Sequence, residues 1–225
     1  ASFIGGGWSN VAGDASTDSF IVIGGGNRNR VTDHHSIIGG GRENRISQEY
    51  SSIVGGYSNL IENTYGFIGG GRFNHIRARD NVIGGGGFNF IDSGDIFSVI
   101  GGGESNKIHN DRCFIGGGRG NIASNIYVVI GGGDLNFARG DSATIGGGWT
   151  NYIGSADAAV IGGGRGNKIY DNCDYSVIPG GRGNIISNSA DYSFAGGLGS
   201  RVNHDGCFLW TDHNTSTLNS TAENQ

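Results

Sequence analysis

The chain has 225 residues, of which 47 are glycine, one is proline and none is methionine. Its formal net charge of −5 argues against general nucleic-acid binding, which needs a clearly basic domain. Hydrophobic residues make up 36% of the chain but form no run near the roughly 18 residues of a membrane helix. Because the chain begins inside a repeat and lacks methionine, we expect it to be a piece of a longer protein.

One short phrase recurs along the chain, as in IGGGRFNHI at 68–76, IGGGESNKI at 100–108 and IGGGRGNKI at 161–169. Counted from its isoleucine as position zero, positions two and three are glycine in all thirteen copies, and position six is asparagine in twelve. Position eight is always apolar, and seven of the twelve spacings are 15 residues. Position zero is occupied by Ile4, Ile23, Ile38, Ile53, Ile68, Ile83, Ile100, Ile115, Ile130, Ile145, Ile161, Ile178 and Phe194.

A 15-residue unit is too short for the helix pairs of helical solenoids, and its glycines oppose helix formation. It suits one turn of an all-β, short-turn parallel β-solenoid, with positions zero and eight facing each other across a narrow interior. Thirteen turns spaced by about 4.8 Å predict a rod on the order of 60 Å long. We expect this solenoid over residues 1–209, followed by a polar linker or arm over 210–225.

The glycines at positions two and three predict a sharp corner with positive φ, or backbone packed too closely for a Cβ atom. Asparagine at position six suits the left-handed region of backbone conformation. Its amide also predicts hydrogen bonds to its own copies in adjacent turns, as in asparagine ladders.

The residue at position −1 is apolar in ten copies. Adjacent strand residues point to opposite faces, so a column beside the inward isoleucines points outward. Ten stacked apolar side chains are too large a patch to leave in water, which predicts a homo-oligomer of parallel copies. A wider monomer with both columns internal needs two apolar positions on the facing strand, and only one is present. This outer apolar column comprises Phe3, Val22, Ile37, Phe67, Val82, Val99, Phe114, Val129, Val160 and Val177.

The phrase SVIGGG…N.I resembles the short-turn β-roll heads of trimeric autotransporter adhesins and the glycine-rich repeats of phage tail fibres. The segment DYSFAGGLGSRVNHDGCFLWTD at 191–212 is similar to segments that close such repeat arrays. The resemblance implies left-handed rolls in a parallel homotrimer outside the cell, at a bacterial surface or in a virion fibre. The longer unit and the triple glycine depart from the adhesin heads.

Position four mixes arginine with aromatic residues, a composition suited to stacking on sugars or bonding to carboxylates. The favoured interpretation is that these side chains bridge subunits or shield backbone at the corner, and the other is that they form a glycan-binding stripe. Position seven adds His75, Phe90, Lys107, Phe137, Tyr152 and Lys168. The stripe comprises Trp8, Arg42, Arg72, Arg119, Trp149, Arg165 and Arg182.

No catalytic, metal or cofactor site is expected from the sequence. The glycine runs lack the GK[ST] of a phosphate loop, and the acidic residues share no obvious repeat position. His34 and His35 beside Asp33 recur in no other repeat, which favours solvated loop residues over a metal site. Three cysteines are an odd number at unrelated spacings, so we expect no disulfide framework. Asn214 and Asn219 match the N-glycosylation pattern, in a Ser/Thr-rich tail where chance matches are common.

These features predict a structural and adhesive module of an extracellular trimeric fibre, with no reaction. Its expected partners are its own copies, side by side or end to end, and a surface glycan, with no nucleic acid and no membrane insertion. A carbohydrate-active solenoid enzyme with an inter-subunit site is the first alternative. Ice binding is the second, although the absence of threonine at position four disfavours it.

Overall fold

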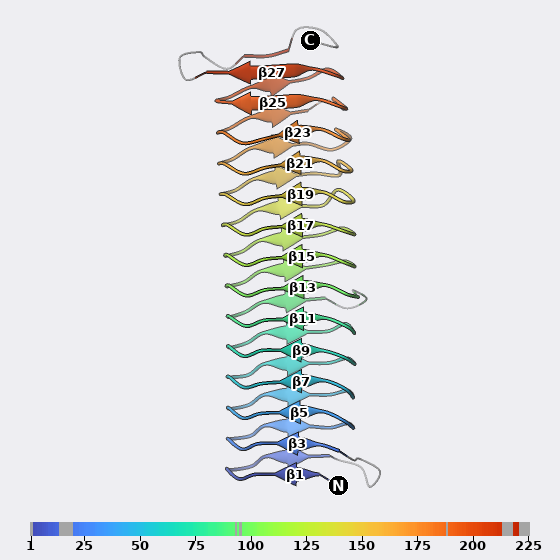
Figure 1. Cartoon of the computed structure of the whole chain (residues 1–225), viewed down its shortest axis with the longest axis vertical. Helices are drawn as coiled ribbons and strands as arrows, with labels where there is room; N and C mark the ends of the chain where they lie inside the picture. Colours follow the sequence, from blue (N-terminus) through green and yellow to red (C-terminus); the bar gives the residue numbers. More distant parts are fainter. Residues whose placement is uncertain are drawn as a thin grey trace. The chain divides into compact units, whose positions relative to one another are not determined.

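The computed structural model describes residues 2–13, 20–92, 94, 96–187, 189–212 and 218–220. It divides the chain into two compact units, Ala1–Arg112 and Cys113–Gln225. The described residues contain strands and no helix, and nearly every strand is two residues long. No helix capable of crossing a membrane is therefore present in the described part. Each unit is a parallel β-solenoid of stacked turns, as the sequence predicts (Figure 1).

In the first unit, two strands belong to each turn and lie in two separate parallel sheets. The odd-numbered strands are β1 (Phe3–Ile4), β3 (Val22–Ile23), β5 (Ile37–Ile38), β7 (Ser52–Ile53), β9 (Phe67–Ile68), β11 (Val82–Ile83) and β13 (Val99–Ile100). The even-numbered strands are β2 (Val11–Ala12), β4 (Arg30–Val31), β6 (Arg45–Ile46), β8 (Leu60–Ile61), β10 (His75–Ile76), β12 (Phe90–Ile91) and β14 (Lys107–Ile108).

The second unit repeats this arrangement. Its odd-numbered strands are β15 (Phe114–Ile115), β17 (Val129–Ile130), β19 (Thr144–Ile145), β21 (Val160–Ile161), β23 (Val177–Ile178), β25 (Phe194–Gly197) and β27 (Phe208–Thr211). Its even-numbered strands are β16 (Ile122–Ala123), β18 (Phe137–Ala138), β20 (Tyr152–Ile153), β22 (Lys168–Ile169), β24 (Ile185–Ile186) and β26 (Arg201–Val202).

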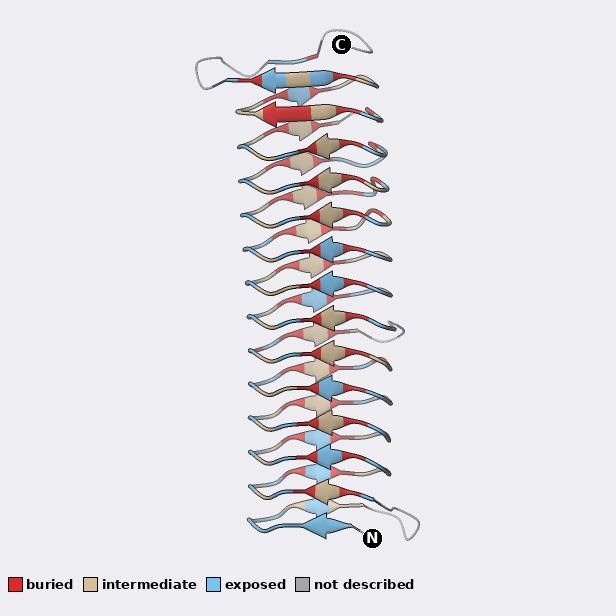
Figure 2. Cartoon of the chain, viewed as in Figure 1, coloured by how far each residue is buried: buried red, intermediate tan, exposed pale blue. Residues whose placement is uncertain are grey.

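Equivalent repeat positions lie opposite one another in successive turns. Ile23 pairs with Ile38, and the Gly24 amide donates to the carbonyl of Ile38 at 2.9 Å. The isoleucines at positions zero and eight from Ile23 onward are fully buried, whereas Phe67 at position −1 is 38% exposed. Figure 2 shows exposed and half-buried residues on the strands beside buried residues in the turns that follow the first one. The predicted inward and outward columns are thus confirmed.

The asparagines at position six form a buried ladder inside each solenoid. Asn59 donates from Nδ2 to the carbonyl oxygens of Gly55 and Gly71, both at 3.0 Å, and to Oδ1 of Asn44 at 3.1 Å. Its own Oδ1 accepts the backbone N–H of Asn74 at 3.1 Å. Each amide therefore satisfies corner carbonyls that the narrow interior hides from water, and it ties three successive turns together.

Besides the corner glycines, the residue with a left-handed φ in each corner is at position five, one residue before the asparagine. Phe73 has φ 54° and Thr150 has φ 53°, while the second unit also places Gly120 there at φ 63°. The expectation that asparagine takes this conformation is wrong. Its amide has to point into the interior, so the preceding, outward-facing residue adopts the positive φ instead.

Glycine at position three meets both of the predicted requirements. Gly56 has φ 99°, and a Cβ added to it would lie 2.1 Å from the carbonyl oxygen of Gly71 and 2.7 Å from Nδ2 of Asn59. A side chain would therefore displace both the next turn and the ladder amide.

The cysteines belong to columns of small buried side chains. Ser51, at position −2, donates from Oγ to the carbonyl of Asn63 at 3.1 Å and accepts the N–H of Gly66 at 3.1 Å. Cys113 takes the same repeat position, with Sγ 2.8 Å from the carbonyl oxygen of Asn125. All three cysteines are buried and none is in a disulfide bond. Burial raises the pKa of the Cys173 thiol.

The last repeat is one residue shorter than the counting assumed. Phe194 lies opposite Val177, so it continues the outer column, and Ala195 takes the fully buried place of the isoleucine. Position four is back in register, because Arg182 pairs with Leu198. The placement of Phe194 at position zero is therefore wrong, since the missing residue lies within the glycine corner. Strand β27 continues to Thr211.

We predict that Asn74→Ala lowers the free energy of unfolding by about 3 kcal/mol, because it strands the buried carbonyls of Gly70 and Gly86 and the N–H of Asn89. Denaturant unfolding followed by circular dichroism measures this loss. Asn27→Ala is the matched control, since the Asn27 amide oxygen accepts no hydrogen bond from any described residue. Equal losses in the two variants would contradict a stabilising role for the ladder.

Candidate binding surfaces

The outer apolar column lies on the outward face of the odd-numbered strands. In the first unit, Phe3 is 60% exposed and Ile37 is 47% exposed, and in the second unit Phe114 is 43% exposed. Val22, Val82, Val99, Val160 and Val177 are half-buried, and Val129 is exposed. Within each unit these side chains follow the in-register strand pairing, interrupted by Ser52 in the first and Thr144 in the second. Each unit thus presents a stripe of apolar side chains to solvent.

A second exposed column, at position −3, was not anticipated. In the first unit, Phe20, His35, Tyr50 and Tyr65 form a continuous ring stack with centroid separations of 5.0, 4.9 and 5.2 Å. All four residues have left-handed φ values between 51° and 59°. The column can be read in the sequence, because His35, Tyr50 and Tyr65 each lie 12 residues after the preceding isoleucine. The stack adds exposed aromatic surface two residues from the outer apolar column.

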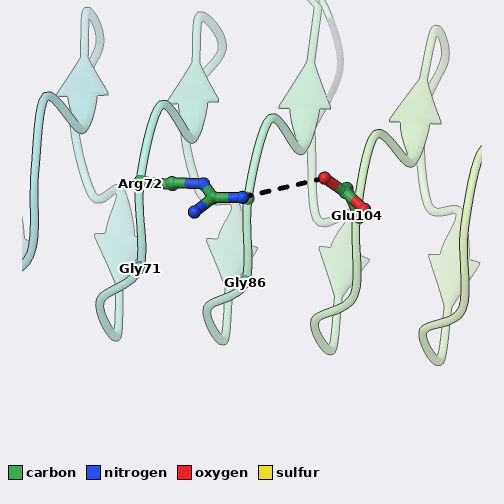
Figure 3. A pocket seen from close by; sticks show the side chains of 5 residues that line it. Gly71, Arg72, Gly86 and Glu104 are labelled. Carbon is green, nitrogen blue, oxygen red and sulfur yellow. Dashed lines mark ion pairs between the residues drawn. The ribbon is translucent and has the colours of Figure 1, made fainter.

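The arginines at position four are largely engaged by neighbours of the same unit. Arg72 reaches across two turns to Glu104, with 3.9 Å between nitrogen and carboxylate oxygen (Figure 3). Nε of Arg42 donates to Glu43 at 3.1 Å, and the Arg42 guanidinium lies 5.5 Å from the centre of the Tyr57 ring. These contacts match the favoured interpretation, in which the side chains shield the corner.

The second unit has the tighter arginine contacts. Arg119 donates two hydrogen bonds of 3.0 Å to the Asp134 carboxylate, and these bonds hold the pKa of that carboxyl below its usual value. Arg165 stacks 4.0 Å from the Trp149 ring centre. Arg182 instead lines an open groove of about 520 Å³ with Leu198 and Trp210. In the first unit, the Arg28 guanidinium lies 5.3 Å from the centre of the Trp8 ring.

The outward face of the even-numbered strands carries two grooves between positions five and seven. The groove in the first unit has a volume of about 520 Å³ and is lined by Phe73, Phe88, His75, Phe90, Asn89, Ser105 and Lys107. The groove in the second unit has about 350 Å³ and is lined by Leu135, Phe137, Thr150, Asn151, Tyr152, Lys168 and Tyr170. Position seven, noted in the sequence as an addition to the stripe, therefore forms surfaces of its own.

His75 is the perturbed titratable group of the first groove. Burial lowers the pKa of its imidazole, although Nε2 lies 3.2 Å from a carboxylate oxygen of Glu62. Desolvation of the imidazolium outweighs this attraction, so His75 is neutral at pH 7. The contact with Glu62 does not have hydrogen-bond geometry.

An acidic column is present where the sequence suggested scattered acids. The backbone N–H groups of Asp141, Asp157, Asp174 and Asp191 each donate to Oδ1 of the next aspartate, at 2.9, 2.8, 2.8 and 2.9 Å, and the series ends at Asp205. The interpretation of the acids as sharing no repeat position is therefore wrong here. Loops of unequal length hid the column, which lies four residues before each inward residue.

The remaining candidates from the sequence are His34, Asn214 and Asn219. His34 lies 3.5 Å from Asp33, and no group of three or more metal-binding side chains in the described residues is arranged to hold an ion. Asn219 is exposed and forms a parallel bridge with Arg201. Asn214 lies outside the described residues.

Comparison with protein-family models and with curated proteins finds no match to the chain.

We predict that thermal stability falls as the pH drops below about 6.5, partly through His75. The pKa of His75 is lower in the folded chain than in the unfolded chain, so protons bind preferentially to the unfolded state below that pH. His75→Phe should reduce the loss of melting temperature between about pH 7.5 and about pH 5.5. His109→Phe, at a more exposed histidine, is the control, and an equal change in both variants would argue against the role of burial.

Proposed function

We propose that the chain is a structural and adhesive module of an extracellular fibre, in which three parallel copies associate along their outer apolar columns. The observation that carries this proposal is the exposure of Ile37, Phe67 and Phe114 on the outward face of a sheet, where the inward isoleucine next to each of them is fully buried. The solenoid interior has no room for a second apolar column, so another molecule has to cover it.

Another copy of the same chain is the simplest partner that could cover the outer apolar column. Equivalent side chains recur at the strand spacing, about 4.8 Å, so the column of a parallel copy matches this spacing turn for turn. The stacked rings of Tyr50 and Tyr65, 5.2 Å apart, enlarge the apolar surface in the first unit. The number three and the extracellular setting come from the resemblance to adhesin heads and tail fibres, and so does the left-handed winding.

The interior chemistry supports a load-bearing role. Within each unit, ladder asparagines such as Asn59 link their own corner to the next turn, and backbone hydrogen bonds run between turns at the strands and at position four. A chain held this way offers a protease few openings, because local unfolding breaks bonds on both sides. A stiff shaft that displays variable outer residues is suited to adhesion.

A carbohydrate-active enzyme is the second candidate, and the aspartate column is the observation that favours it. Carboxylates on adjacent turns lie about one strand spacing apart, close to the roughly 5 Å separation used by retaining glycosidases. Each aspartate from Asp157 to Asp205, however, already uses one oxygen to accept a backbone N–H, which is a structural role. Release of reducing sugar from a bound glycan would support the enzyme, and we expect none. We also expect no thermal hysteresis of the kind that ice binding produces.

We predict that the purified chain has a mass in solution of three times its 23.3 kDa, measured by sedimentation equilibrium. Val99→Asp should reduce this mass to that of one chain, because a carboxylate in the outer column is desolvated without a partner. Leu60→Asp is the matched control, since Leu60 is a half-buried apolar residue on the other sheet.

Leu60→Asp should keep the assembled mass, and circular dichroism of both variants reports whether the fold survives. A wild-type chain that sediments as a single copy would overturn the assembly proposal. An assembled mass that Val99→Asp leaves unchanged would show that the outer column is not the interface.

A further inference from the structure

Lysine occurs only twice in the chain, at Lys107 and Lys168, and both residues occupy position seven. In each case the two preceding turns place rings at the same position. His75 and Phe90 precede Lys107 in register, with ring centroids 5.3 Å apart. Phe137 and Tyr152 likewise precede Lys168, with stacked rings 5.5 Å apart. The same three-turn pattern thus recurs in each unit, on the face opposite the outer apolar column.

Both grooves also have an apolar second wall, at position five. In the first unit this wall is formed by Phe73 and Phe88, which are 40% and 46% exposed and stack at 4.9 Å. In the second unit Leu135, 52% exposed, takes this place beside Thr150. Each groove therefore has apolar side chains on both walls, a hydroxyl group at its edge, and an ammonium group at one end.

Neither ammonium group has an ion-pair partner among the described residues. The acids near the first groove already lie beside other basic side chains, Glu62 beside Arg77, and Asp92 beside Arg77 and His109. In the second unit Asp171 binds Arg139 at 2.9 Å. Each lysine is thus a local positive charge without a partner on a chain whose net charge is −5, which favours an anionic ligand at that point.

We infer that these two grooves, which we call the lysine grooves, bind a linear anionic polysaccharide. The proposal rests on the adhesive part of the proposed function and names its site and ligand class. Sugar rings present apolar C–H faces that pack on aromatic rings, while their edges carry hydroxyl groups. The carboxylate or sulfate of a neighbouring sugar then forms a charge-assisted hydrogen bond with the lysine ammonium.

A peptide ligand fits this surface less well. Strand addition needs a row of unpaired backbone groups, but the amides of His75, Phe90 and Tyr152 already donate to the next turn at 2.9 Å. A polymer that alternates apolar faces with acidic groups can pack on the aromatic walls and bind the lysine ammonium at the same time.

The test is isothermal titration of the full chain with polygalacturonate, with its methyl-esterified neutral form, and with dextran sulfate. We expect binding of a polyanion, carboxylated or sulfated, and much weaker binding of the neutral ester. Lys107→Met with Lys168→Met should weaken polyanion binding about tenfold or more. Phe90→Leu with Tyr152→Leu should weaken the binding of charged and neutral polymer alike.

The matched control is Arg45→Met with Arg201→Met. Both arginines occupy position seven and are exposed, but neither lines a lysine groove. Their substitution removes the same positive charge as the substitution of the two lysines. The control variant should bind as the wild type does. Equal weakening in the lysine and arginine variants, equal binding of the neutral ester, tighter binding of polyglutamate, or no polyanion binding at all would each overturn the proposal.

Failure of this proposal is distinguishable from failure of the proposed assembly, because the lysines lie outside the outer apolar column. The mass in solution is measured on the same samples. A single-copy chain that binds the polyanion would refute the proposed assembly and support the proposed ligand of the lysine grooves. An assembled chain that binds no polyanion would support the assembly and refute the proposed ligand.

Discussion

The hydrogen bonds of the buried asparagine amide are the interaction on which the rest of this structure depends. A turn of about 15 residues has to reverse direction within a few glycines, and it leaves carbonyl groups in an interior too narrow for water. The amide of Asn59 satisfies two such carbonyls, Gly55 and Gly71, and receives the N–H of the next asparagine. Glycine is needed at position three for the same reason, because a Cβ at Gly56 would occupy the space of this amide.

With the interior determined by the ladder and the isoleucines, the outward positions are free to carry function. Position −1 supplies apolar side chains on one sheet, and position seven supplies the rings and lysines of the other. The corner at position four pairs arginines with acids and rings, as Arg119 does with Asp134. Assembly and ligand binding can therefore use different faces of one scaffold, and a change on one face need not disturb the other.

The aspartate column was missed because the loops before the strands of the second unit differ in length. Asp157, Asp174 and Asp191 occupy one column, yet their distances from the preceding isoleucine are unequal. A parallel strand aligns residues by their distance to the strand that follows the loop, so the aspartate column is found by counting backward from that strand.

The residue pattern alone was sufficient for the β-solenoid, the buried isoleucines and the outward apolar column, because two-residue alternation and a constant corner leave one consistent arrangement. The tertiary structure decided which corner residue takes the left-handed conformation, that Phe194 moves outward in place of an inward isoleucine, and that Arg72 pairs with Glu104 two turns away. These outcomes depend on which side chains meet across adjacent turns, and spacing along the chain does not contain that information when a corner loses a residue or a loop gains one.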